Sequence, residues 1–155
     1  MRKTLVMIPA FGCDGGLYAG VAGGLAVDAV VHVAREDSFA AMTETLLAQA
    51  PDEFLVLGTS MGGRLALEVA LTAPERVQGL VVIGSGAGPV ADVVAGRRRS
   101  ARLRGGEMED VLREMGDMIA HMPGPRGPAT REAFMAMGRA TVAEIMARQS
   151  DALAG

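Results

Sequence analysis

The stretch FLVLGTSMGGRLALE, residues 54–68, decides the fold. It opens with an apolar run typical of a buried strand, and it closes with apolar residues at helical spacing. Between these lies the pattern G-x-S-x-G, in which Gly58 and Gly62 flank Ser60. In such a strand-to-helix turn the serine oxygen projects above the sheet, and the glycines let strand and helix pass close together. The stretch therefore predicts that Ser60 is a nucleophile at the start of a helix.

On both sides of this stretch, short apolar runs alternate with helical patterns and glycine-rich turns, as in a parallel α/β sheet. The runs are apolar on consecutive positions, which predicts strands covered on both faces. The expected strands are 5–8, 29–33, 54–57 and 80–83. The expected helices between them are 17–25, 38–50 and 61–73. The predicted fold class is α/β, with three layers and a mainly parallel sheet of about four strands.

The second part of the chain has no strand pattern. It begins with a basic run at 97–104, followed by an acidic amphipathic helix whose apolar positions run from Met108 to Ile119. A segment rich in proline and glycine at 123–128 separates this helix from a last one predicted at 130–152. We therefore expect two regions, a core at 1–96 and a helical, cap-like segment at 97–155.

Composition excludes several classes of function. The formal net charge of −3 implies no general attraction to nucleic acid or to an anionic membrane. Tryptophan is absent, which disfavours a surface that binds bases by aromatic stacking. A single cysteine, Cys13, suits a reducing compartment, and no apolar run is long enough to span a bilayer. Because Cys and His do not cluster, we expect no metal, and we expect no cofactor. These features predict a cytoplasmic protein.

The turn after the first strand, PAFGCD at residues 9–14, is the second candidate element of a site. In this layout, the amide just past that strand and the amide after the serine together bind an oxyanion. We place these two donors at Phe11 and Met61. The simpler alternative is an ordinary glycine loop leaving a strand. For Cys13, which has no basic neighbour in sequence, packing is the preferred interpretation.

At these residues the chain resembles the α/β-hydrolase superfamily, particularly small esterases and acyl hydrolases that open directly with the oxyanion strand. The resemblance is carried by residues 5–14, 58–68 and 73–82. It implies the strand order 2-1-3-4, which places Phe11 and Ser60 at the carboxyl ends of neighbouring strands, where open α/β sheets bind ligands. It also implies a small-molecule acyl substrate, such as a carboxylic ester.

The family pattern continues with two further strands that carry the triad acid and the histidine, and this chain stops short of them. We therefore expect a partial α/β-hydrolase core that is inactive or weak in isolation. His32 is expected within the second strand, whereas His121 ends the methionine-rich helix and is a possible base. Strand 80–83 would become an apolar edge, which predicts a homo-oligomer or a complementing chain.

Two other functions stay open at this point. The first is a non-catalytic oligomeric remnant or interaction module that keeps the same core. The second is a nucleotide-binding α/β domain, to which Gly12, Gly15 and Gly16, with Glu36 beyond the second strand, would contribute. The glycine spacing is not G-x-G-x-x-G and there is no P-loop lysine, so the nucleotide-binding alternative ranks last.

Overall fold

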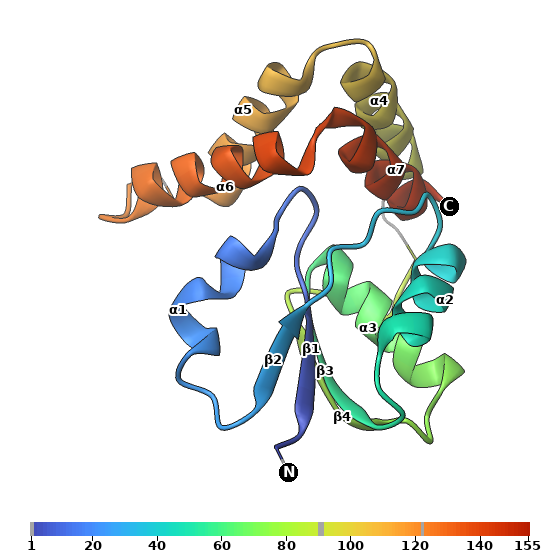
Figure 1. Cartoon of the computed structure of the whole chain (residues 1–155). Coiled ribbons are helices and arrows are strands. Elements are labelled where there is room, and N and C mark those ends of the chain that lie inside the picture. The colour runs from blue at the N-terminus through green and yellow to red at the C-terminus, as the bar shows by residue number, and fades with distance from the viewer. Residues whose placement is uncertain (1, 90–91, 122) are drawn as a thin grey trace.

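The computed structural model describes residues 2–89, 92–121 and 123–155, and it contains a parallel sheet of four strands (Figure 1). The strand order is β2-β1-β3-β4, which confirms the predicted order 2-1-3-4. Every neighbouring pair is parallel. The strands are β1 (Thr4–Ile8), β2 (Asp28–Val31), β3 (Phe54–Thr59) and β4 (Val77–Ile83).

Helices lie on both faces of the sheet, with α1 on one face and α2 and α3 on the other (Figure 1). Helix α2 (Phe39–Gln49) begins after Ser38, whose hydroxyl accepts the N–H of Ala41, and α3 (Met61–Thr72) begins after Ser60. Both helices match the predicted ones closely. The helix predicted at 17–25 is wrong in extent, because the segment forms a 3-10 turn, η1 (Gly15–Tyr18), and a single turn, α1 (Ala19–Ala22). Gly23 and Gly24 follow directly, and the low helix propensity of glycine disfavours a longer helix there.

Four helices lie above the carboxyl ends of the strands (Figure 1). The basic run falls in α4 (Val93–Arg104), and the acidic helix is α5 (Met108–Ile119). The single helix predicted at 130–152 is wrong, because α6 (Gly127–Thr141) and α7 (Ala143–Ala154) are separate. They are divided by Val142, whose φ of 66° interrupts the helical hydrogen bonding. A β-branched residue at positive φ is unusual, and nothing in the local sequence indicates this break.

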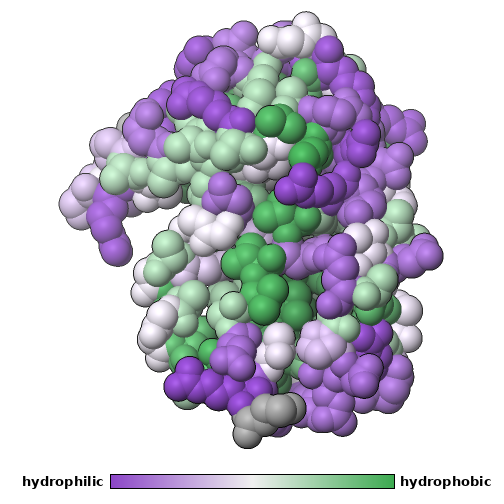
Figure 2. Space-filling model, in the orientation of Figure 1, coloured by the Kyte–Doolittle hydropathy of each residue, from purple (hydrophilic) through white to green (hydrophobic). Residues whose placement is uncertain are grey.

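Only the two inner strands are covered on both faces. Every residue of β2 is exposed, and β4 exposes Leu80, Val81 and Ile83. The prediction of full burial is therefore wrong for the two edge strands, because consecutive apolar residues do not themselves provide a neighbouring strand or a covering helix. Figure 2 shows apolar side chains gathered on the visible face in the region where Figure 1 places β2.

One hydrophobic core joins the sheet to the helices above it. Phe11 and Met61, from the two turns of the candidate site, belong to the same buried cluster as Leu112 of α5 and Met146 of α7. This core therefore crosses the predicted boundary at residue 96. A smaller cluster on the α1 face contains Leu5, Met7 and Tyr18. Of the helices in the described ranges, none combines the length and the apolar character needed to cross a membrane.

Candidate active site

Ser60 lies at the turn between β3 and α3, and its side chain is exposed. Its backbone has φ 54° and ψ −116°, a conformation that costs a non-glycine residue about 1–3 kcal/mol. The Ser60 N–H donates to the carbonyl of Ile83 at 2.8 Å, while the Ser60 carbonyl accepts the N–H groups of Gly63 and Arg64 at 2.9 and 3.1 Å. These bonds hold the strained turn between β4 and the first turn of α3. The serine oxygen therefore projects from a fixed backbone.

Two glycines make this turn possible. A Cβ atom added to Gly58 would overlap the carbonyl group of Gly62, so strand and helix approach without any side chain between them. A Cβ atom added to Gly62 would overlap the carbonyl oxygen of Ile8, at the end of β1. Helix α3 therefore begins directly against the ends of both inner strands.

The two predicted oxyanion donors, Phe11 and Met61, follow the carboxyl ends of β1 and β3. Both residues are buried. Among the residues that the structure describes, neither backbone N–H donates a hydrogen bond. Buried amides are ordinarily paired, so these two N–H groups, on the turns that follow neighbouring strands, are free to donate to an external acceptor.

The Phe11 turn is held by a side chain from the far end of the chain. Gln149 of α7 is buried, and its Oε1 accepts the N–H of Gly12 at 3.0 Å. Its Nε2 donates to the carbonyl of Ala34 at 2.8 Å, beyond the end of β2. The Thr141 hydroxyl donates to the Met137 carbonyl at 3.0 Å and also lies 3.4 Å from the Gly12 carbonyl oxygen. Helices α6 and α7 thus fix the backbone next to the Phe11 amide.

A second polar contact ties the ends of the two inner strands together. The Tyr18 hydroxyl donates to the carbonyl of Ile8 at 2.7 Å and lies 2.8 Å from the hydroxyl of Thr59. Because the tyrosine proton goes to Ile8, the Thr59 hydroxyl is the donor in the second bond. Burial raises the pKa of Tyr18, so the side chain stays neutral. Tyr18 therefore aligns the residue before Ser60 with the end of β1.

A hollow of about 560 Å³ opens at Ser60. Arg64 forms part of its wall and shapes it by donating to the carbonyls of Ala87 and Gly88 at 3.3 and 3.0 Å. The arginine also pairs with Glu68 at 2.8 Å, which offsets its charge. The hollow is lined by Ser60, Met61, Arg64, Gly84, Ser85, Gly86, Gly88, Pro89 and Leu153.

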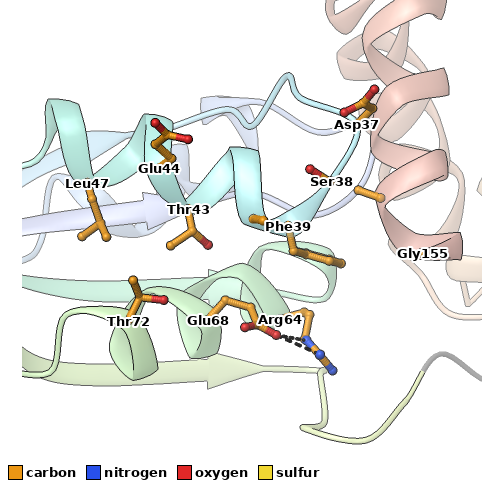
Figure 3. Close-up of a pocket in the computed structure, with 12 residues that line it drawn as sticks. Asp37, Ser38, Phe39, Thr43, Glu44, Leu47, Arg64, Glu68, Thr72 and Gly155 are labelled. Carbon is orange, nitrogen blue, oxygen red and sulfur yellow. Dashed lines mark hydrogen bonds and ion pairs between the residues drawn. The ribbon is translucent and has the colours of Figure 1, made fainter.

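A larger hollow of about 730 Å³ lies between α2 and α3, beside the end of α7 (Figure 3). Figure 3 shows Phe39 of α2 facing Arg64 and Glu68 of α3, which pair with each other. Ser38 also lines this hollow, but its hydroxyl caps α2. We therefore place the candidate site at the hollow of Ser60.

Neither histidine lines the hollow at Ser60. His121 lies exposed in the connection between α5 and α6, so the structure does not bring the predicted base to the serine. The prediction that His32 lies within the second strand is wrong, because β2 ends at Val31 and His32 follows it. Burial lowers the pKa of His32, and its Nε2 is buried without a hydrogen-bond partner among the described residues. Burial also raises the pKa of Cys13 to about 12, which disfavours the thiolate, and the side chain packs in the core, as predicted.

Three residues of the site were not identified from the sequence, namely Tyr18, Arg64 and Gln149. Arg64 stands four residues after Ser60 on the same helix, so its position could have indicated a wall of the site. Gln149 stands three residues after Met146, on the same side of the helix as that buried residue. A polar residue at this spacing was the signal that could have indicated a buried hydrogen bond. The partners of Tyr18 and Gln149 depend on long-range packing that no local pattern encodes. Within the described ranges, no group of three or more His, Cys, Asp and Glu side chains is placed to hold a metal ion.

Comparison with known proteins agrees with this fold. The family model for the alpha/beta hydrolase fold matches residues 14–115. The enol-lactonase from Burkholderia xenovorans LB400 superposes with a TM-score of 0.87 at 14% sequence identity, covering 100% of this chain and 66% of the lactonase. A hydrolase from Pseudomonas aeruginosa gives 0.77 at 21% identity, covering 98% of this chain and 64% of that enzyme.

The bottromycin epimerase BotH, solved in complex with bottromycin A2, gives a TM-score of 0.73 at 18% identity, covering 99% of this chain and 64% of BotH. The chain thus spans slightly less than two thirds of the length of each of these structures. At such identities the superpositions establish the fold alone, while the family match covers well over half of the chain. This protein belongs to the alpha/beta hydrolase fold family.

Proposed function

We propose that this chain supplies the nucleophile and the oxyanion donors of a serine hydrolase that acts on carboxylic esters or related acyl substrates. Ser60 is the nucleophile, and the N–H groups of Phe11 and Met61 bind the oxyanion. The observation that carries the proposal is the exposed serine on a strained turn, followed directly by the unpaired amide of Met61, with a second unpaired amide at Phe11 on the turn after the neighbouring strand. A small molecule fits the hollow at Ser60, which has the volume of a typical ligand site.

The proposed reaction has two acyl-transfer steps. The Ser60 oxygen attacks the carbonyl carbon of the ester, the hydroxyl proton passes to a base, and the carbonyl oxygen becomes an oxyanion held by the two amides. The tetrahedral intermediate then expels the alcohol, which leaves an acyl group on Ser60. Water attacks this acyl-enzyme, releasing the carboxylic acid and restoring the serine. Every step that forms the oxyanion uses the same two amides.

Among the described residues, neither histidine lines the hollow at Ser60, so neither is placed to act as its base. In a comparable serine hydrolase, losing the histidine lowers kcat by about a millionfold, equivalent to about 8 kcal/mol of barrier. We therefore propose that the 155-residue chain alone hydrolyses esters very slowly. Full activity would require a histidine from a further segment or from a second chain.

Two observations support an acyl ester as the substrate class. The wall of the hollow is largely apolar and includes Met61, Pro89 and Leu153. One of the similar structures is an enol-lactonase, and a lactone is an internal carboxylic ester. We also propose a cytoplasmic location, because the single cysteine, Cys13, cannot form an internal disulfide and so suits a reducing compartment.

The test is covalent trapping of Ser60 by an alkyl fluorophosphonate, followed by intact mass and peptide mapping. The serine oxygen bonds to phosphorus, fluoride leaves, and the hydroxyl proton goes to solvent. The two amides would stabilise the phosphoryl oxygen, and such sites keep about 10³–10⁴-fold catalysis over water when the triad is incomplete. We expect one adduct, on Ser60, after prolonged incubation of the folded chain.

The controls are Ser60→Ala and the urea-unfolded chain. Ser85 lines the same hollow and serves as an internal comparison, because it meets the same reagent without the strained turn. An adduct on Ser85 instead of Ser60, or no adduct in the folded chain, would contradict the proposal. The second result would favour a non-catalytic interaction module with the same core.

We also propose that two copies of the chain pair through β4. This strand is an edge of the sheet and exposes Leu80, Val81 and Ile83 to solvent. An apolar edge with free backbone groups is a ready template for another strand, and a second copy presents the same edge. The opposite edge, β2, is shorter and begins with a charged residue, Asp28, which disfavours pairing.

A dimer is the expected result when the mass of the chain in solution is measured by light scattering at micromolar concentration. Val81→Lys should shift the protein to monomer, because a charged side chain on an edge strand opposes pairing. Val21→Lys, at another exposed valine on α1, should leave the mass unchanged. A monomer for the unmodified chain would refute pairing through β4.

A further inference from the structure

Two facing rows of side chains border the hollow between α2 and α3. Each row has three residues spaced four apart, so its members share one face of their helix. Figure 3 shows the two rows turned toward each other. The rows are Phe39, Thr43 and Leu47 on α2, and Arg64, Glu68 and Thr72 on α3.

Thr43 has a polar atom in this hollow that is not used. The residue is buried, with 5% of its surface exposed, and its Oγ1 has no hydrogen-bond partner among the described residues. A threonine within a helix can donate to the carbonyl four residues before it, but Thr43 does not. Buried hydroxyl groups are ordinarily paired, because losing the hydrogen bonds to water is costly when nothing replaces them. The Thr43 oxygen is therefore available to a group that enters the hollow.

The charged side chains of the hollow favour a cation. Both contacts of Arg64 with Glu68, from Nε at 2.9 Å and from Nη2 at 2.8 Å, go to Oε1, so Oε2 of Glu68 is open to another donor. Asp37 and Glu44 also line the hollow and are exposed. Within the described ranges neither forms an ion pair. With three acidic side chains and one arginine, the lining carries a net negative charge.

We propose that this hollow binds an organic cation, namely a primary ammonium group on a hydrocarbon chain. The ammonium group has three donors, of which one would go to Oγ1 of Thr43 and one to Oε2 of Glu68. The hydrocarbon chain would lie against Phe39 and Leu47. The volume of about 730 Å³ is that of a site for a small organic molecule.

An anion is disfavoured because the one arginine of the hollow is already engaged. The Arg64 guanidinium pairs with Glu68 and donates to the carbonyls of Ala87 and Gly88. Arg64 also lines the hollow of Ser60, so the two hollows share one side chain of their walls. The cation site itself requires no reaction at Ser60.

The first experiment titrates hexylammonium into the isotope-labelled chain at pH 7 and follows amide shifts by nuclear magnetic resonance. Hexan-1-ol, of the same chain length, is the uncharged comparison. We expect saturable shifts in α2 and α3, with hexylammonium bound about tenfold more tightly, since a hydrogen bond to a charged group contributes about 1.5 kcal/mol. Equal affinities for the two compounds, or shifts that do not saturate, would overturn the proposal.

The second experiment uses variants. Thr43→Val should weaken hexylammonium binding about tenfold without lowering the urea midpoint, because the hydroxyl that it removes is unpaired in the free chain. Glu68→Gln should also weaken binding, whereas Glu75→Gln removes the same charge at an exposed position outside the hollow and should keep the affinity.

Ser60→Ala should bind hexylammonium as the unmodified chain does, so this site can stand even if no reagent labels Ser60. Unchanged affinity in both Thr43→Val and Glu68→Gln would refute the site. A lower urea midpoint for Thr43→Val would mean that the hydroxyl is already paired within the chain, and it would refute the site as well.

Discussion

Replacing Gly62 with alanine is expected to destabilise the fold by about 3 kcal/mol or more, at the upper end of what overpacking costs. The added Cβ would overlap the carbonyl oxygen of Ile8 and would lie 2.6 Å from the carbonyl oxygen of Pro9. Both obstacles are backbone atoms, so no side chain can rotate to make room. Relief would require α3 to move away from the end of β1. The free energy of unfolding, measured by urea titration and circular dichroism, checks this.

The matched control is Gly20→Ala, on α1. A Cβ atom at Gly20 meets nothing within 4 Å. This substitution should be neutral or slightly stabilising, because alanine favours helix over glycine by up to about 1 kcal/mol. Equal urea midpoints for Gly62→Ala and the unmodified chain would mean that α3 does not begin directly against β1.

The second large effect is expected for Gln149→Leu, which should cost about 3 kcal/mol of stability. Leucine has a similar size but leaves the Gly12 N–H and the Ala34 carbonyl buried without partners. Each unsatisfied group costs about 1–3 kcal/mol. The loss should also slow labelling of Ser60, because the Gly12 bond holds the backbone next to the Phe11 amide. The two readouts are the urea midpoint and the labelling rate in the absence of urea.

Arg148→Leu is the control on the same helix. Arg148 is exposed and, within the described ranges, pairs only with Glu144, so its loss should change stability by no more than about 0.5 kcal/mol. Gln149→Glu keeps the acceptor for Gly12 and removes the donor to Ala34, so an intermediate effect is expected. Should Gln149→Leu unfold at the same urea concentration as Arg148→Leu, the two hydrogen bonds of the Gln149 side chain would not contribute to stability.

The central part of the fold could be predicted because its cause is local. The motif at 54–68 determines a strand, a strained turn and a helix from consecutive residues. The family resemblance then supplied the order of the strands. Ser60, Phe11 and Met61 follow from the same two turns, and the structure places both turns at the carboxyl ends of neighbouring strands.

The parts that could not be predicted depend on distant contacts. Gln149 and Gly12 are 137 residues apart, and no local pattern joins them. The break at Val142 gives no signal either, since valine neither favours positive φ nor commonly ends a helix. The exposure of β2 depends on which elements flank the sheet. The apolar composition of the strand does not indicate those neighbours.

The two hydrogen bonds of the Gln149 side chain have a consequence for the order of events during protein synthesis. A ribosome releases the amino end first, so β1 and the turn at Gly12 emerge long before α7. Contacts between segments so far apart in the chain are also slow to form, because a large loop must close first. The nascent chain can therefore fold the turn at Ser60 while the Gly12 N–H beside Phe11 still lacks its acceptor. The oxyanion site that we propose would be completed only when α7 docks.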